Sequence, residues 1–399
     1  MIDLAEAQAH VLDRVAPLAT MEVTLADALG AVTSVEVRAA ESVPPFANSA
    51  MDGYAVRAVD TAGAPVVLEV LGMVAAGAAS DVVVGPGQAM RIMTGAPVPA
   101  GADAVVLVER TRTDGDRVTI EISVEAGTSV RGVGEDVRPG DVVIGAGEVL
   151  TPGHLGVLAS VGIDRVSVTR RPRVGVLSTG DELVTSGALG RGQIRDSNRP
   201  TLLALVREAG LEAVDLGVAA DDEASVTGAI TGAVASCDAV LTSGGVSMGD
   251  LDYVKVVLDQ LGDMRWMQIA IKPAKPFAFG TVDGVPVFGL PGNPVSSMVS
   301  FELLARPALR RMAGRRDLHR LTVAATAPDG LRRSRDGKIH FARVVAEQDD
   351  AGAWAVRSAG GQGSHHLTAM AAANALAVLP DGDGVAPGEH VSVMLLGWS

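Results

Sequence analysis

The stretch that most constrains the fold is residues 239–252, which read AVLTSGGVSMGDLD. It opens on an uninterrupted apolar run, as expected of a strand buried on both faces of a parallel sheet. A small polar loop with Ser243, Gly244, Gly245 and Ser247 follows, and an apolar stripe typical of a helix begins soon afterwards. Loop amides and a helix N-terminus at the carboxyl edge of such a sheet attract anions. This order therefore predicts an anion-binding loop.

Two carboxylates, Asp250 and Asp252, end this loop. Carboxylates do not bind phosphate directly, but Mg²⁺ accepts carboxylate and phosphate oxygens together. We therefore expect a divalent cation that bridges this loop to a bound phosphate. A lone Gly-Gly pair would be explained more simply as a tight turn, and it is the other motifs of the chain that favour the binding interpretation.

The length and the net charge of the chain limit the kinds of function that it can have. A chain of 399 residues predicts two to four domains, and 48% hydrophobic with 20% charged residues is typical of folded chains. The net charge of −14 argues against nonspecific nucleic-acid binding, which needs clustered Lys and Arg. An anionic substrate must then be met by locally placed cations. The single cysteine, Cys237, excludes an internal disulfide and a cysteine metal cluster.

The N-terminus shows no features of a targeting segment. It is amphipathic and acidic, without the basic and apolar regions of a signal peptide. No stretch approaches the roughly 18 consecutive apolar residues of a membrane-spanning helix. The sequence predicts a cytoplasmic protein that makes no membrane contact.

The pattern of apolar segments predicts an α/β multidomain protein. Strands alternate with helices over residues 171–316, which predicts a doubly wound α/β/α domain with a mostly parallel sheet. Short glycine-broken β-like runs predict a β-rich domain at 56–139, inserted into an N-terminal linker and helical domain formed by 1–55 and 140–170. Further short strands over 317–399 predict a C-terminal domain resembling a β-barrel.

Local signals place several helices. Asp3 is expected to cap a first helix, and Thr151 before Pro152 is expected to cap another. Residues 25–29 predict a short helix, and residues 295–312 predict one long helix.

Four further motifs accompany the glycine loop. They are 48–54 (NSAMDGY), 178–182 (STGDE), 271–276 (IKPAKP) and 289–296 (GLPGNPVS). Together with the SGG loop they resemble the molybdopterin molybdenumtransferase family, whose members insert molybdate into adenylylated molybdopterin in the last step of molybdenum cofactor synthesis. The E domain of gephyrin is similar. The resemblance covers nearly the whole chain, in the family's order.

The residues themselves indicate how these motifs would cooperate. Loops that follow different parallel strands meet at one sheet edge, so Ser178–Glu182, Ser243–Ser247 and Pro291–Ser297 are expected to share a site. Lys272 and Lys275 are each followed by a proline, which fixes φ and stiffens the segment. A stiff pair of ammonium groups suits a small oxyanion, although two solvated lysines are an equally good explanation from the residues alone.

The resemblance assigns roles to individual residues. It implies that Mg²⁺ is bound by Glu182 and Asp252, with Asp250 as an exposed alternative, and that Asp52 and Asp136 join them as catalytic carboxylates. Without it, Asp52 and Asp136 would be turn residues. Molybdopterin or its nucleotide would contact Thr94, Arg131, Ser178, Thr179, Gly180, Asp221, Ser243, Gly244, Gly245 and Ser247. Molybdate would contact Lys272, Lys275, Pro291, Ser296, Arg343 and Ser364.

The same resemblance implies a mechanism and partners. Mg²⁺ would hold the pyrophosphate of adenylylated molybdopterin, molybdate would meet the dithiolene sulfurs, and AMP would leave. Catalysis would rest on positioning and charge neutralisation, because the chain offers no nucleophile. A homodimer is implied, with the site between the inserted domain of one subunit and the doubly wound domain of the other. The molybdopterin adenylyltransferase is a further candidate partner. Adenylylation of molybdopterin itself, or a gephyrin-like scaffold without catalysis, are the alternatives.

Two positions depart from the family pattern. Ala274 replaces a glycine, so the loop must avoid positive φ or accept strain. Gln268 stands where some relatives carry a basic residue.

Asp221 and Asp222 would by themselves be a helix cap. His365 and His366 resemble a metal pair, but neighbours in a strand face opposite sides, which argues against a shared metal.

Overall fold

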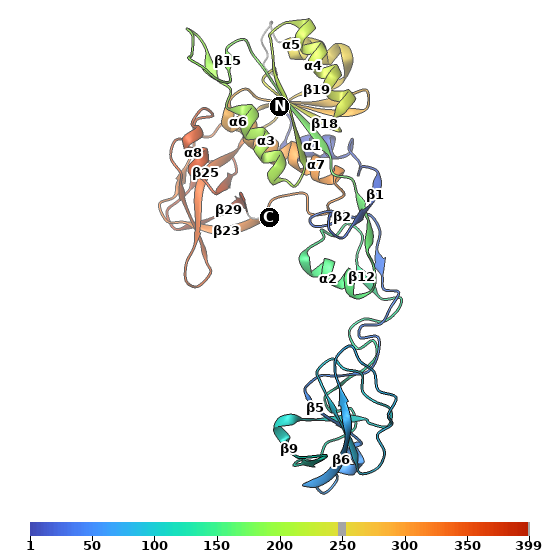
Figure 1. The fold of residues 1–399 in the computed structure, drawn as a ribbon. Coiled ribbons are helices and arrows are strands. Elements are labelled where there is room, and N and C mark those ends of the chain that lie inside the picture. Colours follow the sequence, from blue (N-terminus) through green and yellow to red (C-terminus); the bar gives the residue numbers. More distant parts are fainter. Residues whose placement is uncertain (246–252, 398–399) are drawn as a thin grey trace.

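The computed structural model describes residues 1–245 and 253–397. Figure 1 shows an elongated molecule with the α/β domain at one end and the C-terminal β-domain packed beside it. A small N-terminal domain connects this body through a narrow neck to the inserted β-domain, which lies at the opposite end. The expected multidomain α/β architecture is confirmed.

The α/β domain contains a six-stranded sheet in the order β17-β14-β18-β22-β21-β19. The first four strands run parallel to one another, and β21 is antiparallel to both of its neighbours, β22 and β19. Their bounds are Glu212–Ala219, Arg173–Thr179, Ala239–Ser243, Val285–Leu290, Pro276–Val282 and Gly262–Gln268. Every residue of β18 is buried, as its apolar run predicts. The sequence did not reveal β19, the edge strand.

Helices cover both faces of this sheet. Residues from α1, α3, α6 and α7 form one core with Phe279 and Phe288, whose ring centroids lie 5.0 Å apart. Residues from α4 and α5 form the opposite core with Leu177 and Val240. The helices are α1 Leu4–Leu12, α3 Asn198–Glu208, α4 Glu223–Ser236, α5 Tyr253–Leu261, α6 Pro294–Ser300 and α7 Arg306–Met312.

The long helix expected at 295–312 is interrupted. A π-helical turn, Phe301–Ala305, separates α6 from α7. Pro307 has no amide hydrogen to donate to the Leu303 carbonyl one turn earlier, which disturbs the regular pattern. That carbonyl instead accepts a hydrogen bond from Gln8 Nε2 at 2.9 Å, so the widened turn anchors α1.

The structure confirms the two predicted helix caps, but the short helix predicted at residues 25–29 is wrong. The Asp3 side chain accepts from the Glu6 amide at 2.7 Å, and Thr151 caps α2, Pro152–Ser160. The segment 25–29 forms only turns, with the Asp27 amide bonded to the Thr24 carbonyl at 3.1 Å. So short a segment lacks the packing needed to offset helix nucleation.

The N-terminal domain is held together by small antiparallel sheets. Its strands are β1 Thr20–Thr24, β2 Val32–Thr33, β3 Val37–Arg38, β12 Val142–Ile144 and β13 Arg165–Thr169. The inserted domain contains a six-stranded sheet in the order β8-β5-β7-β6-β10-β9. Its strands are β5 Gly53–Val56, β6 Val66–Val74, β7 Gln88–Ile92, β8 Ala104–Leu107, β9 Thr111–Asp114 and β10 Arg117–Ile120. At its neck β4, Asn48–Ser49, pairs with β11, Val130–Arg131.

The C-terminal domain is a closed barrel, as predicted. Its five strands are β23 Thr322–Ala327, β25 Ile339–Gln348, β26 Trp354–Ser358, β27 Ala375–Leu379 and β29 Glu389–Leu395. A short strand of the α/β domain, β20 Ile271–Lys272, pairs parallel with β25 and places Lys272 opposite His340. This pairing brings the lysine motif against the barrel. The remaining elements are β15 Leu183–Val184, β16 Ile194–Arg195, β24 Leu331–Arg332, β28 Gly384–Val385 and α8 Leu367–Ala372.

Among the helices of the described ranges, none has the length and apolar character needed to cross a bilayer.

Candidate functional site

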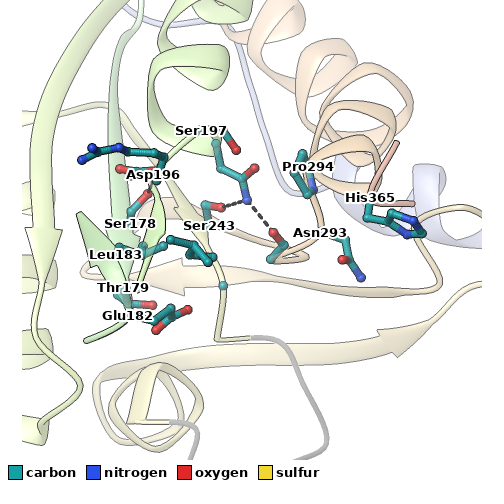
Figure 2. Close-up of a pocket in the computed structure, with 15 residues that line it drawn as sticks. Ser178, Thr179, Glu182, Leu183, Asp196, Ser197, Ser243, Asn293, Pro294 and His365 are labelled. Carbon is teal, nitrogen blue, oxygen red and sulfur yellow. Dashed lines mark hydrogen bonds between the residues drawn. The ribbon is translucent and has the colours of Figure 1, made fainter. Parts of the chain in front are cut away.

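A cavity of about 300 Å³ lies at the carboxyl edge of the parallel strands (Figure 2). Three loops contribute to its wall, one after each of β14, β18 and β22. The residues from these loops are Ser178, Thr179, Glu182, Ser243, Gly244, Gly292, Asn293 and Pro294. The three loops expected to share one site therefore do meet, because parallel strands end at a common edge.

Glycine is required where the second loop leaves β18. Gly244 and Gly245 have φ of 97° and 75°, in the region that side chains rarely adopt. A Cβ on Gly245 would lie 2.3 Å from the Cβ of Val254, so the loop could not pack against α5. The chain can turn here only because both positions lack a side chain.

Asn198 ties two of these loops together. Its Nδ2 donates to Ser243 Oγ at 2.8 Å and to the Gly292 carbonyl at 2.7 Å (dashed lines in Figure 2). Its Oδ1 is buried and has no hydrogen-bond partner among the described residues. An unpaired buried acceptor is costly, so a donor on a bound ligand would be favoured here. No sequence motif pointed to Asn198.

Asp196 holds the first loop and was also missed. Its buried carboxylate accepts from Ser178 Oγ at 3.2 Å and from Arg199 Nε at 2.9 Å. Arg199 also contacts Asp215, which lies on β17. The available signal was the polar segment Asp196-Ser197-Asn198 directly before an apolar-periodic helix, the usual position of capping residues.

Asp221 and Asp222 lie next to this cavity without lining it. Asp222 caps α4 by accepting from the Ser225 amide at 2.8 Å, and bonds from the Ser225 hydroxyl and amide lower its pKa. Asp221 accepts from the Asp181 amide at 3.4 Å, and its own amide donates to the Asp181 carboxylate at 3.1 Å. This pair links the loop after β14 to the start of α4.

A second cavity, of about 460 Å³, adjoins the first. It brings together four residues expected to contact molybdate, namely Lys272, Lys275, Ser296 and Ser364. Lys338 also lines it and was not anticipated. His365 lines both cavities, and the Ser364 carbonyl accepts from the Val295 amide at 3.2 Å. The two cavities are therefore neighbours along the loop 361–366. We call the second one the lysine cavity.

Arg343 is buried behind a third cavity of about 340 Å³, which it lines together with Lys272, Arg333 and His340. Its guanidinium donates to the carbonyls of Gly361 and Gly363 at 3.1 and 3.2 Å. Burial lowers its pKa, and its Nε has no partner within the described ranges. Arg343 thus lines a different cavity from Lys275, and Lys272 lines both. Pro291, the remaining residue of the expected set, lines neither cavity.

The lysine motif adopts a strained backbone. Ala274 is buried and has a φ of 77°, in the left-handed region. The loop has therefore accepted strain, the second of the two outcomes considered for the missing glycine. The cost for a non-glycine residue there is about 1–2 kcal/mol.

The inserted domain holds its own polar cluster. Asp52 accepts from the Thr94 amide at 2.7 Å and from its hydroxyl at 2.8 Å, and these bonds, the amide first, lower the pKa of Asp52. Arg131 lies on β11, and the Asp136 amide donates to the Val43 carbonyl at 3.0 Å. Asp52 and Thr94 belong to the inserted domain, and Arg131 and Asp136 belong to its neck; the inserted domain lies at the opposite end of the molecule from the α/β domain (Figure 1). One chain therefore does not bring them to Glu182.

Two of the three expected metal residues, Asp250 and Asp252, lie outside the described ranges, as does Ser247, an expected contact of molybdopterin or its nucleotide. In the part of the chain that the structure describes, no group of three His, Cys, Asp or Glu side chains is arranged to hold a metal ion. His365 and His366 occupy a turn before α8, so placing them in a strand was wrong. Their ring centroids lie 4.1 Å apart in an edge-on contact.

Known families and relatives match the chain over nearly its full length. The models for the MoeA N-terminal region (domain I and II), a probable molybdopterin binding domain and the MoeA C-terminal region (domain IV) match residues 2–162, 175–311 and 310–396. The molybdopterin molybdenumtransferase of Haemophilus influenzae is 39% identical over 98% of both chains. The chain belongs to the molybdopterin molybdenumtransferase family.

Two further relatives of this family support the assignment. Molybdopterin molybdenumtransferase 2 of Mycobacterium tuberculosis is 40% identical over 96% of both chains. The crystal structure of the molybdopterin biosynthesis moeA protein from Pyrococcus horikoshii OT3 superimposes with a TM-score of 0.84 at 30% identity, covering 99% of this chain and 100% of that one.

Proposed function

We propose that the chain inserts molybdate into adenylylated molybdopterin and releases AMP, which yields the molybdenum cofactor. The observation that carries this proposal is that a cavity at the sheet edge, lined by hydroxyl groups and a glycine turn, adjoins a cavity lined by three lysines. A phosphorylated pterin and a small oxyanion could therefore be held side by side in a chain whose net charge is −14. The relatives from Haemophilus influenzae and Mycobacterium tuberculosis carry the transferase name, and no observation favours adenylylation or scaffolding.

The sheet-edge cavity would bind the pyrophosphate and nucleotide part of the substrate. Ser178, Thr179 and Ser243 offer hydroxyl groups, and the glycine turn at Gly244 leaves backbone room for a phosphate. Asn198 keeps the loops after β18 and β22 at a set separation. The lining residues include no activated nucleophile, so rate enhancement would come from positioning and from neutralising charge.

The lysine cavity would hold molybdate as the second substrate. Lys272 and Lys275 supply charge, and Ser296 and Ser364 supply hydroxyl donors. The β20–β25 pairing and the turn at Ala274 fix the lysine segment, so little freedom is lost when the oxyanion binds. Molybdenum would then pass to the dithiolene sulfurs of molybdopterin, which would reach into the lysine cavity past His365, where the two cavities meet.

Magnesium fits the donor chemistry of the first cavity. The Glu182 carboxylate lines it, and no hydrogen bond or ion pair within the described ranges engages that carboxylate. Mg²⁺ is commonly bound by one or two carboxylates together with substrate phosphates. Glu182, with Asp252 or Asp250, would hold the ion. When bound, the ion would neutralise charge that develops on the phosphoanhydride oxygens as AMP departs.

We further propose a homodimer in which a second copy completes the site. The Asp52–Thr94 cluster presents a carboxylate with a lowered pKa, yet it lies far from the cavities of its own chain. Asp52, Thr94, Arg131 and Asp136 would then face the pyrophosphate bound by the partner copy. Mixing Asp52→Asn with Lys275→Ala should restore part of the activity that each variant alone has lost. Mixtures that stay inactive under conditions of subunit exchange would exclude a shared site.

The function is tested directly with purified protein. Incubation with adenylylated molybdopterin, Mg²⁺ and molybdate should release AMP and incorporate molybdenum in equal amounts. ATP with molybdopterin should give no adenylylated product. Adenylylation without molybdenum incorporation would instead identify an adenylyltransferase, and neither reaction would indicate a scaffold.

A further inference from the structure

Asp336 is surrounded by basic side chains at the rim of the lysine cavity. Its carboxylate lies 3.0 Å from Lys338 Nζ, 3.0 Å from His340 Nε2 and 3.9 Å from Lys272 Nζ. Arg333 Nη2 donates to it at 2.9 Å. Two of the three lysines that line the lysine cavity therefore share this one carboxylate.

Several short bonds hold the Asp336 carboxylate, whereas its contact with Lys272 is long. Arg333 is buried and also donates to the carbonyls of Lys338, Leu379 and Pro380 at 2.6, 3.1 and 2.9 Å. The Asp336 amide is bonded to Asp381 at 3.2 Å. Lys272, in contrast, has a half-exposed side chain and only the longest of these contacts.

Asp336 is charged at neutral pH. Although burial alone would raise its pKa, the hydrogen bonds from Lys338 and His340 lower the pKa to about 2. An anion that enters the lysine cavity must therefore compete with this carboxylate for Lys272 and Lys338 and is also repelled by it.

We propose that the Asp336 carboxylate competes with the oxyanion for Lys272 and Lys338 and so lowers the affinity of the lysine cavity for molybdate. The lower affinity would let molybdate leave the lysines and react with the dithiolene. This inference rests on the proposed function. Asp336 is a positioning and affinity-setting residue, since it acts through Lys272 and Lys338. Binding an oxyanion tightly before the reaction would stabilise the ground state as much as the transition state, which does not accelerate the chemical step.

Oxyanions of different charge distinguish an electrostatic role of Asp336 from a purely structural one. Coulomb energies scale with the product of the charges, so a carboxylate weakens a dianion about twice as much, in free energy, as a monoanion of the same shape. Molybdate and tungstate are tetrahedral dianions, and perrhenate is a tetrahedral monoanion of similar size. A disordered loop would instead weaken all three.

The test is calorimetric titration of the full chain with molybdate, tungstate and perrhenate. Asp336→Asn should tighten molybdate and tungstate about tenfold and perrhenate only about threefold. Asp336→Glu should retain wild-type affinities. Asp383→Asn is the matched control, because Asp383 is an exposed carboxylate of the same domain paired with Arg335 at 2.8 Å, and it should change binding by less than about twofold.

Unchanged or weaker molybdate binding by Asp336→Asn would overturn the inference. An equal fold-change in affinity for molybdate, tungstate and perrhenate would overturn it as well. If the wild-type protein binds no oxyanion, both the proposed function and the inference about Asp336 fail. Binding by wild type without tightening in the variant refutes this inference alone. Thermal melting checks the fold. If Asp336→Asn unfolds, Asp336→Ser, which keeps an acceptor for Arg333, is subject to the same expectation.

Discussion

Replacing Asn198 should loosen the sheet-edge cavity. Asn198→Ala removes the bonds of 2.8 Å to Ser243 and 2.7 Å to the Gly292 carbonyl. At about 1 kcal/mol net for each hydrogen bond, the free energy of unfolding should fall by about 2 kcal/mol. Because misplacement by about 1 Å can cost about 100-fold in rate, we expect kcat/KM for AMP release to fall by about 10- to 100-fold.

Asn198→Asp should be worse than Asn198→Ala. The aspartate has nearly the same shape but offers no N–H donor, and it places a negative charge against the Gly292 carbonyl and any bound phosphate. Electrostatic repulsion then adds to the lost hydrogen bonds, so kcat/KM should fall further.

The matched control for both variants is Asn374→Ala. Asn374 also makes two backbone bonds, with Ala346 at 2.7 and 2.8 Å, but it lies in the C-terminal barrel and lines neither cavity. It should lower stability by a similar amount and leave kcat/KM unchanged. AMP release and thermal melting measure the two effects. Equal kcat/KM for wild type and Asn198→Ala, or equal losses in Asn198→Ala and Asn374→Ala, would refute the reasoning.

The remaining predictions concern the oxyanion, the core and acid stability. Lys275→Ala should raise KM for molybdate at least about tenfold while leaving the affinity for adenylylated molybdopterin unchanged, in line with the loss of a direct charge contact. Glu302→Ala should lower the free energy of unfolding by about 3 kcal/mol in chemical denaturation, because buried Arg320 loses its bond of 2.9 Å to Glu302 and keeps only Glu208, and buried Arg306 loses its ion pair with the same carboxylate. Glu212→Ala, which breaks the exposed pair with Arg173, should lower it by less than about 1 kcal/mol. Since the pKa of Asp336 is lowered to about 2, its stabilisation is present above the unfolded value near 3.8 and is lost as pH falls towards 2; melting curves of Asp336→Asn should lack this part of the acid dependence.

Much of the scaffold could be predicted because its signals are local. The apolar run of β18, the caps at Asp3 and Thr151, and the glycine turn after β18 all depend on residues a few positions apart. The convergence of three loops followed from a general property of parallel sheets. The edge strand β19 was missed because residues 262–268 mix charged, polar and apolar side chains without clear alternation.

The unpredicted parts of the site depend on tertiary contacts. Asn198 matters because β18 and β22 place Ser243 and Gly292 within reach of one amide. Lys338 and Asp336 matter because β20 joins the barrel and carries Lys272 to them. The distance of Asp52 from the cavities depends on the geometry of the neck, which no local pattern encodes.

The position of bound tungsten decides whether two neighbouring cavities hold the two anions. Crystals soaked with tungstate and AMP would give an anomalous signal from the metal and density for the nucleotide. We expect tungsten among Lys275, Ser296 and Ser364, with the AMP phosphate beside Ser243 and Gly244 in the adjoining cavity. Tungsten and AMP on separate, unconnected surfaces would contradict it.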